Sequence, residues 1–187
     1  VGRVLGALGI AQKAGSIIDP MAGRGDLITA CRELGAKPKV VGAIEIDALA
    51  HRECSLRLPD VSCLRGSAFD THTLTRLPAS EWDLVISNPP YVRYQNMKKP
   101  GAVADTPSAE EVRSGLHRAL DTMSALDPED RRLFKLLSES YSGLADLAVP
   151  SWILCASMVR VGGRLALVVP ESWLSREYAS IVNYILL

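Results

Sequence analysis

Short apolar runs alternate with stretches of helical periodicity over the first half of the chain. Four runs have the length and the β-branched content of strands, and they cover residues 16–19, 39–46, 61–64 and 82–87. Between them, the pattern predicts helices over residues 26–35 and 47–58. Because strands that alternate with helices form βαβ units, we expect a doubly wound, mostly parallel α/β sheet with both faces covered.

The second half of the chain predicts a helical insertion. Ser108 is a predicted helix N-cap, with Glu111 at capping-box spacing. Two amphipathic helices are expected at about 108–125 and 129–142. This segment is too long for a simple connection, so we interpret it as an insertion after the fourth strand, on the sheet edge or over a functional site.

The end of the chain predicts one more helix and one more strand. The helix is expected over about 144–160, and Gly162-Gly163 then lead into a strand over 164–169. No repeat or low-complexity segment divides the sequence, so its 187 residues are interpreted as one domain.

Composition and charge narrow the class of protein. No run approaches the roughly 18 consecutive apolar residues of a membrane span, and no signal peptide is recognisable, so we expect a cytoplasmic protein without a membrane partner. The charges of the 21 basic and 21 acidic residues cancel. Because contacts to phosphate groups dominate nucleic-acid affinity, a nucleic-acid partner would have to be bound mainly by residues outside this sequence. The four cysteines and three histidines lack metal-site spacing, and we predict no metal.

The first candidate site is the loop that follows the first strand. Gly23 and Gly25 let the backbone approach a ligand at the carboxyl end of that strand, where open α/β sheets bind ligands. Asp19 opens the loop and suits a cationic ligand, and the loop lacks the glycine spacing of a phosphate cradle. Glu45 ends the second strand, at the offset where nucleotide-binding sheets place a carboxylate for ribose hydroxyls. The third strand ends at Gly66–Asp70, within reach of an adenine ring.

The strongest signal is Asn88-Pro89-Pro90-Tyr91, directly after the fourth strand. The consecutive prolines stiffen the chain and fix the direction of its carbonyl groups. The side-chain oxygen of Asn88 and the carbonyl of Pro89 are predicted to accept both hydrogens of one amino group. Two such bonds favour a tetrahedral nitrogen whose lone pair attacks a methyl group. Tyr91 offers a flat face on which a planar substrate stacks.

The glycine loop, the acidic strand end and Asn-Pro-Pro-Tyr, in this order, resemble class I S-adenosylmethionine-dependent methyltransferases that act on exocyclic or amide nitrogens. The sequence segments 88–95 and 162–173 are similar to the corresponding motifs of γ-type adenine-N6 DNA methyltransferases from restriction-modification systems. The resemblance covers about residues 15–185. It implies a Rossmann-like sheet, S-adenosylmethionine as cofactor and DNA as partner, with a recognition domain and a nuclease domain or subunit outside this sequence.

The resemblance also implies roles for individual residues. The implied cofactor-binding residues are Asp19, Pro20, Ala22, Gly23, Gly25, Glu45, Ser67, Ala68, Asp70 and Asn88. The implied catalytic residues are Asn88, Pro89, Pro90 and Tyr91. Of these, Asn88 and Pro89 would bind the target amine, and Tyr91 would stack on the target base. Two positions depart from the family pattern: Arg24 replaces a small loop residue, so that its bulk either crowds the cofactor or reaches outward, and Ser67 replaces a common acidic residue, for which Asp70 is a substitute.

The implied organisation is a methyltransferase catalytic domain over residues 1–187 that is incomplete at both ends. Its parts are a cofactor and catalytic half, a helical insertion and a carboxyl-terminal part of the sheet, over 15–95, 96–143 and 144–187. The basic residues Arg93, Lys98 and Lys99 are hypothetical phosphate contacts, and Asp146 lies in a stretch near the site of such enzymes. A protein glutamine or RNA amino-methyltransferase, or a non-catalytic cofactor- or partner-binding fragment, stays open as an alternative.

Overall fold

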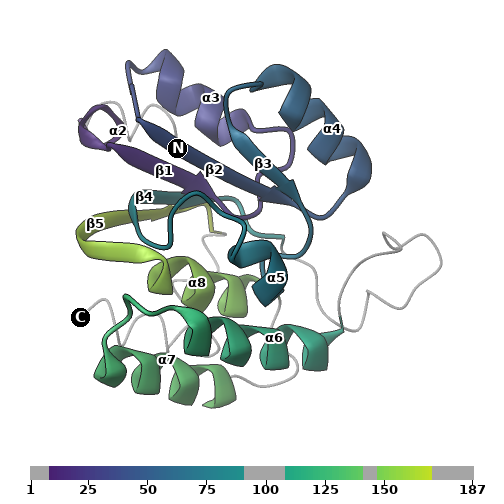
Figure 1. Cartoon of the computed structure of the whole chain (residues 1–187), viewed down its shortest axis with the longest axis vertical. Helices are drawn as coiled ribbons and strands as arrows, with labels where there is room; N and C mark the ends of the chain where they lie inside the picture. Colours follow the sequence, from purple (N-terminus) through teal and green to yellow (C-terminus); the bar gives the residue numbers. More distant parts are fainter. Residues whose placement is uncertain (1–8, 91–107, 141–146, 170–187) are drawn as a thin grey trace.

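The computed structural model describes residues 9–90, 108–140 and 147–169, which are built around a five-stranded parallel sheet (Figure 1). Its strands are β1 (Ser16–Asp19), β2 (Val40–Glu45), β3 (Ser62–Arg65), β4 (Trp82–Ser87) and β5 (Val159–Leu167). The strand order is β3-β2-β1-β4-β5, so the direction of winding reverses between β1 and β4. The predicted doubly wound α/β fold is confirmed, and this reversal is its topological switch point.

Helices cover both faces of the sheet. They are α2 (Ile10–Lys13), α3 (Asp26–Glu33), α4 (Ala48–Arg57), α5 (Thr71–Leu74), α6 (Ala109–Thr122), α7 (Pro128–Ser140) and α8 (Ala148–Ser157). Figure 1 shows α3 and α4 on one face and α8 on the other, with α6 and α7 beyond α8. The single-turn helices α2 and α5 were not predicted, because a segment of four residues carries no helical periodicity.

The alternation of side chains along the central strands divides the core into two parts. Ile17 of β1 and Leu84 of β4 are fully buried in the cluster under α3 and α4. Their neighbours Ile18 and Val85 are equally buried in the cluster that includes α6 and α8. Successive strand residues point to opposite faces, so a strand buried on both sides is apolar at consecutive positions. This explains the consecutive apolar residues Ile17-Ile18 in β1 and Leu84-Val85-Ile86 in β4.

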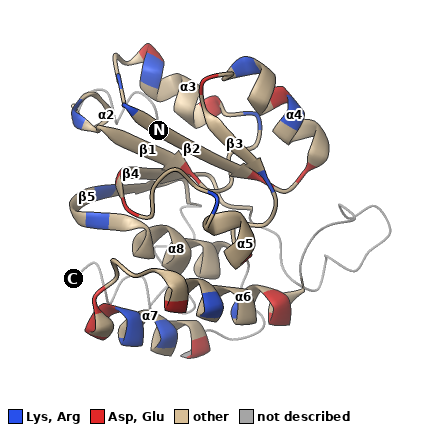
Figure 2. Ribbon diagram, viewed as in Figure 1, with Lys and Arg blue, Asp and Glu red and all other residues tan. Residues whose placement is uncertain are grey.

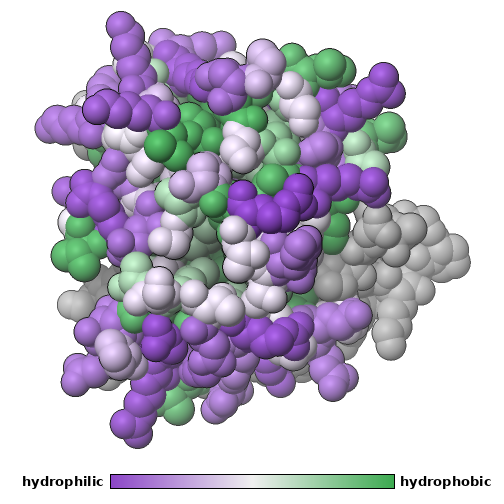
Figure 3. Space-filling view, in the orientation of Figure 1, coloured by the Kyte–Doolittle hydropathy of each residue, from purple (hydrophilic) through white to green (hydrophobic). Residues whose placement is uncertain are grey.

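The predicted insertion forms two helices that belong to the core. The capping box is confirmed, because the Ser108 amide donates to Glu111 Oε2 at 2.7 Å and the Glu111 amide donates to Ser108 Oγ at 3.2 Å. Leu116 and Leu120 are fully buried in the cluster shared with α8. The insertion was predicted to lie on the sheet edge or over a functional site; the sheet edge is not the observed place, since α6 and α7 form a second helical layer over one face. Figure 3 shows mostly hydrophilic side chains over this layer, at the bottom of the view.

A close contact joins α6 to the segment that follows β3. A Cβ atom on Gly115 of α6 would lie 2.3 Å from the carbonyl oxygen of Phe69. Real Cβ atoms do not approach a backbone oxygen so closely, so only glycine lets the helix rest on this segment. Phe69 is itself 6% exposed and packs in the cluster that α6 completes.

The structure corrects the predicted end of the sheet. Gly162 and Gly163 lie inside β5 and not in a turn before it, and α8 ends at Ser157. Gly162 has a φ of 76°, and the pairing of β5 with β4 shifts register between Trp82 and Leu84. These are the properties of a β-bulge, where glycine is favoured because the strand must bend. A pattern that treats two glycines as a break therefore places the start of β5 too late.

Candidate functional site

The candidate site lies at the switch point of the sheet, where the carboxyl ends of β1 and β4 meet. The two strands pair in parallel, and the Ser87 hydroxyl donates to Asp19 Oδ1 at 2.9 Å. The chain continues from β1 into the glycine loop and from β4 into Asn88-Pro89-Pro90. Asn88 and Pro90 are exposed, whereas Pro89 is buried. The two strongest sequence signals are thus neighbours at the edge where doubly wound sheets bind ligands.

Asp19 is a carboxyl group held inside the protein. It is 1% exposed, and its Oδ1 atom also accepts a hydrogen bond from the Met21 amide at 3.1 Å. The pKa of Asp19 is raised to about 7: burial raises it most and the nearby charge of Glu45 adds to this, while the hydrogen bonds from Met21 and Ser87 act in the opposite direction. A buried carboxylate is costly without a cation beside it, so this position favours a cationic ligand.

The glycine loop is shaped by two residues with opposite surroundings. Gly25 has a φ of 81°, and a Cβ atom there would lie 2.6 Å from Leu58 Cδ1 and 3.0 Å from Cys54 Sγ. Gly23 has a φ of 54°, and a Cβ atom there would meet nothing within 4 Å. The absence of a side chain at Gly25 therefore lets the loop pack closely against α4 and the residue that follows it, while Gly23 borders open space. That open side is where a ligand would approach the backbone.

Glu45 binds the loop to the end of β2. Its Oε2 atom accepts from the Gly23 amide at 2.7 Å, and its Oε1 atom accepts from the Asp47 amide at 2.7 Å. The Ala22 amide donates to the carbonyl oxygen of Ile44 at 2.9 Å, which holds the loop alongside the strand. The half-buried carboxylate keeps further acceptor positions, since each oxygen has two lone pairs. Two ribose hydroxyls are suitable donors for them.

Arg24 reaches outward, which resolves the first departure from the family pattern. Its Nε atom pairs with Glu53 Oε2 at 2.9 Å, and both side chains are largely exposed. Arg57 donates to the carbonyl oxygen of Arg24 at 3.0 Å and to Asp26 Oδ1 at 2.6 Å. These contacts lie on the α4 side of the loop, so the bulk of Arg24 does not occupy the open side at Gly23.

The segment after β3 lies next to Glu45, because the Gly66 amide donates to the Glu45 carbonyl oxygen at 3.0 Å. Ser67 Oγ accepts from the Phe69 amide at 3.1 Å. Asp70 is the N-cap of α5 and accepts from the amides of His72 and Thr73. These bonds lower the pKa of Asp70. The structure thus gives Asp70 a helix-capping role that the sequence analysis did not foresee.

Of the other predicted site residues, some are buried and the rest lie outside the residues that the structure describes. Pro20, Ala22 and Ala68 are buried, so they shape the loops through packing and their backbone groups. Tyr91, the basic residues 93, 98 and 99, and Asp146 lie outside the described residues. The sequence analysis missed Ser87, although its place as the last residue of a central strand, directly before Asn88, was a usable signal.

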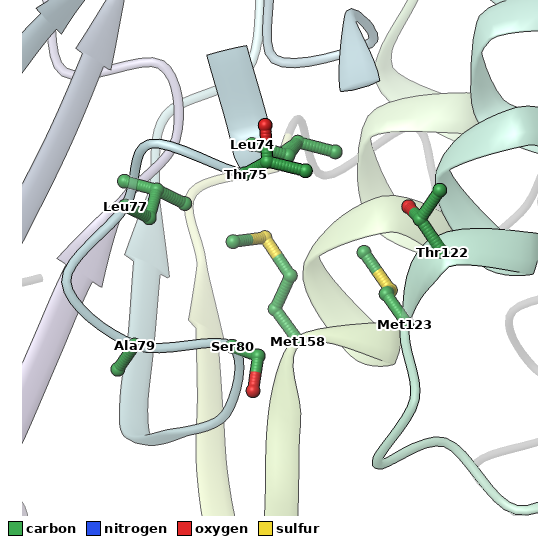
Figure 4. Close-up of a pocket in the computed structure, with 8 residues that line it drawn as sticks. All are labelled: Leu74, Thr75, Leu77, Ala79, Ser80, Thr122, Met123 and Met158. Atoms are coloured by element: carbon green, nitrogen blue, oxygen red, sulfur yellow. The ribbon is translucent and has the colours of Figure 1, made fainter. Parts of the chain in front are cut away.

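An apolar pocket of about 190 Å³ lies at the opposite ends of the strands (Figure 4). Leu74, Leu77, Met123 and Met158 are among its lining residues. Met158 directly precedes β5, and the loop that completes the wall precedes β4, so the pocket faces the amino ends. It is not part of the candidate site.

Charges of both signs are interspersed on α4, α6 and α7 (Figure 2), in agreement with the zero net charge. Within the described ranges, no helix is both long and apolar enough to cross a membrane. The same ranges contain no group of three His, Cys, Asp or Glu residues arranged to hold a metal ion.

Comparisons with known proteins agree with this geometry. A family model described as "Eco57I restriction-modification methylase" matches residues 65–186, more than half of the chain. No curated protein matches the sequence. A solved structure described as a class I S-adenosylmethionine-dependent methyltransferase, from Listeria monocytogenes, aligns with 99% of this chain at a TM-score of 0.63 and 16% identity.

Two further solved structures are similar over different shares of the chain. A TehB-like S-adenosylmethionine-dependent methyltransferase from Corynebacterium glutamicum aligns with 98% of this chain and 71% of its own, with 11% identity and a TM-score of 0.48. A protein from Pyrococcus horikoshii described as an RNA methyltransferase aligns with 48% of this chain and 43% of its own, with 26% identity and a TM-score of 0.38. The chain spans 50% of the Listeria structure and 43% of the Pyrococcus structure.

Proposed function

Because this chain belongs to the Eco57I restriction-modification methylase family, we propose that it methylates N6 of adenine in DNA as part of a restriction-modification system. The family resemblance predicted from the sequence is confirmed, and the cofactor of this class of methyltransferase is S-adenosylmethionine. The choice of adenine and of DNA is the part that we propose. The family match supports this choice. One observation carries the placement of methyl transfer at this site: the Asp19–Ser87 hydrogen bond joins the two strand ends, so that Asn88 follows directly beside a loop suited to a cation.

The residues of the site fit S-adenosylmethionine, whose methionine part is cationic. Asp19 supplies a buried carboxylate, and Gly23 borders open space that a Cβ atom would fill. Glu45, already bonded to the amide of Gly23, has acceptor positions for the ribose hydroxyls. The segment from Ser67 to Asp70, next to Glu45 through Gly66, would face the adenine of the cofactor.

The Asn88-Pro89-Pro90 segment would bind the target. When bound, S-adenosylmethionine supplies an electrophilic methyl group. The Asn88 side-chain oxygen and the Pro89 carbonyl would accept the two hydrogens of the adenine amine, which directs the nitrogen lone pair away from the ring system. Tyr91 would stack on a base that is flipped out of the duplex. Fixed acceptors of this kind act by orientation and by stabilising the charge that develops on the nitrogen.

We further propose that residues 15–95 form the cofactor and catalytic half, 96–143 the helical insertion, and 144–187 the carboxyl-terminal part of the sheet. DNA recognition would then depend on a further domain. The basic residues Arg93, Lys98 and Lys99 are proposed as local phosphate contacts, and a cytoplasmic location follows from the substrate.

Removing the carboxylate of Glu45 is expected to weaken S-adenosylmethionine binding about 100-fold, since it removes the charged acceptor to which two ribose hydroxyls are proposed to donate. Isothermal titration calorimetry of Glu45→Ala measures this. Glu53→Ala is the matched control, because it removes an exposed carboxylate from the outer side of the same loop. Its dissociation constant is expected to stay within about twofold of the wild-type value. Equal losses in both variants would contradict the assigned site.

The substrate is tested with the full-length protein, including the proposed recognition domain, by transfer of a labelled methyl group from S-adenosylmethionine to DNA, RNA or protein, followed by identification of the modified base or residue. We expect N6-methyladenine in duplex DNA and no label in a duplex whose adenines are replaced by 2-aminopurine. That base lacks the amine at the required position. Label in RNA or in glutamine side chains instead of DNA would replace the proposed substrate by one of the alternatives.

A further inference from the structure

Asp19 is surrounded by groups that do not neutralise a negative charge. The negative charge of Glu45, at the end of β2, raises the pKa of Asp19, and the charge of Asp19 in turn contributes to the raised pKa values of the Cys31, Cys54 and Cys155 thiols, which lie on α3, α4 and α8. Ser87 of β4 donates a hydrogen bond to Asp19. Among the described residues, no Lys, Arg or His forms an ion pair with Asp19.

The hydrogen bonds of Asp19 stabilise its charge only in part. Both donors, the Met21 amide and the Ser87 hydroxyl, bind the same oxygen, Oδ1. No described donor binds Oδ2, and the side chain is 1% exposed to solvent. A carboxyl group in such surroundings is partly protonated near neutral pH, and a cation that binds beside it favours the ionised form.

We propose that binding of the cationic cofactor expels one proton from Asp19, so that the affinity for S-adenosylmethionine is set by pH near neutrality. This inference rests on the proposed function, because it assumes that the ligand of the glycine loop is S-adenosylmethionine. The positive charge of the cofactor's methionine part favours the carboxylate over the carboxylic acid. The proton leaves to solvent, and the negative charge that replaces it pairs with the ligand.

The direction of the pH effect follows from the raised pKa of Asp19, about 7 without ligand. Below pH 7 the site must lose a proton before it pairs with a cation, so affinity falls as pH falls. Above pH 8 the group is already ionised, and affinity no longer changes through Asp19. Linkage predicts that about 0.9 proton is released per ligand at pH 6, about 0.5 at pH 7 and about 0.1 at pH 8. The dissociation constant is about tenfold higher at pH 6 than at pH 8.

Calorimetric titration of S-adenosylmethionine at one pH in two buffers of different ionisation enthalpy measures the number of protons released. The cofactor's own amine has a pKa near ~8, so it stays protonated at pH 6 and contributes nothing there. Asp19→Asn, which has the same shape but cannot ionise, is expected to release no proton at pH 6. In Ser87→Ala the carboxylate loses a donor, so its pKa rises and half-maximal proton release moves to a higher pH.

The outcomes separate this inference from the proposed function. Wild-type binding without proton release at pH 6, or with equal dissociation constants at pH 6 and pH 8, overturns the inference and leaves the cofactor assignment intact. Proton release that persists in Asp19→Asn, or that keeps its midpoint in Ser87→Ala, assigns the proton to another group and also overturns it. A folded chain that does not bind S-adenosylmethionine at pH 8 overturns both.

Discussion

Asn88→Ala is expected to lower the rate of methyl transfer by at least ~100-fold, with S-adenosylmethionine affinity changed by no more than about fivefold. Asn88 is exposed and follows the last residue of β4, so its replacement leaves the core intact. What it removes is one of the two acceptors proposed to hold the target amine. Losing one fixed hydrogen-bonding group at a reacting centre typically costs ~10²–10³ in kcat. Single-turnover transfer of a labelled methyl group to adenine-containing DNA measures the effect.

Two companion variants make the Asn88 result specific. Asn88→Asp keeps a side-chain oxygen acceptor at the same position, so it is expected to retain much more activity than Asn88→Ala. Gln12→Ala removes a side-chain amide from α2, where its nitrogen donates to the Leu34 carbonyl oxygen, and is expected to transfer methyl groups at the wild-type rate. An Asn88→Ala variant with the same rate as Gln12→Ala would remove Asn88 from the catalytic machinery.

Replacing each of the two loop glycines by alanine is expected to have different effects on stability and on cofactor affinity. Gly25→Ala should lower the free energy of unfolding by ~2–4 kcal/mol, because the new methyl group overlaps Leu58 and Cys54 and the residue has a positive φ. Gly23→Ala meets no atom and should cost only the ~1–2 kcal/mol of a left-handed alanine. Its methyl group, however, enters the space proposed for the cofactor, so S-adenosylmethionine affinity should fall at least ~30-fold.

Urea unfolding and calorimetric titration of the same two proteins separate these effects. Stability is the main loss in Gly25→Ala, and ligand affinity is the main loss in Gly23→Ala. If Gly23→Ala binds S-adenosylmethionine as tightly as the wild type does, the open side of the loop is not the ligand side. The cofactor would then have to be placed elsewhere along the carboxyl ends of the strands.

Most of the sheet was predictable from local signals. β1 and β4 are buried on both faces, so each contains consecutive apolar residues, and β4 has the predicted limits of residues 82 and 87. β5 was harder, because its bulge places two glycines inside a strand. The place of α6 was also not predictable, since its amphipathic pattern shows a buried face but not which partner that face meets.

The segments that form the candidate site were predictable from the sequence, but the hydrogen bonds and ion pairs between them were not. The strand-end positions of Asp19 and Glu45 follow from the pattern of strands and loops. That Asp19 bonds to Ser87 depends on β1 and β4 being neighbours, which no local feature of either strand reveals. The direction of the Arg24 side chain, in the loop after β1, depends likewise on Glu53, which lies on α4. Contacts between segments that are distant in the chain are the part that required the structure.

The contact of Gly115 with Phe69 also limits how this protein can vary over evolutionary time. α7 can diverge without changing what lies against the segment after β3, because the contact is made by Gly115 of α6. A slide of α6 by one residue, in contrast, would bring Ser114 or Leu116 onto the Phe69 carbonyl oxygen, where there is no room for a side chain. The register of α6 therefore cannot change without changing the segment after β3, which is proposed to face the adenine of the cofactor, even though the two are far apart in sequence.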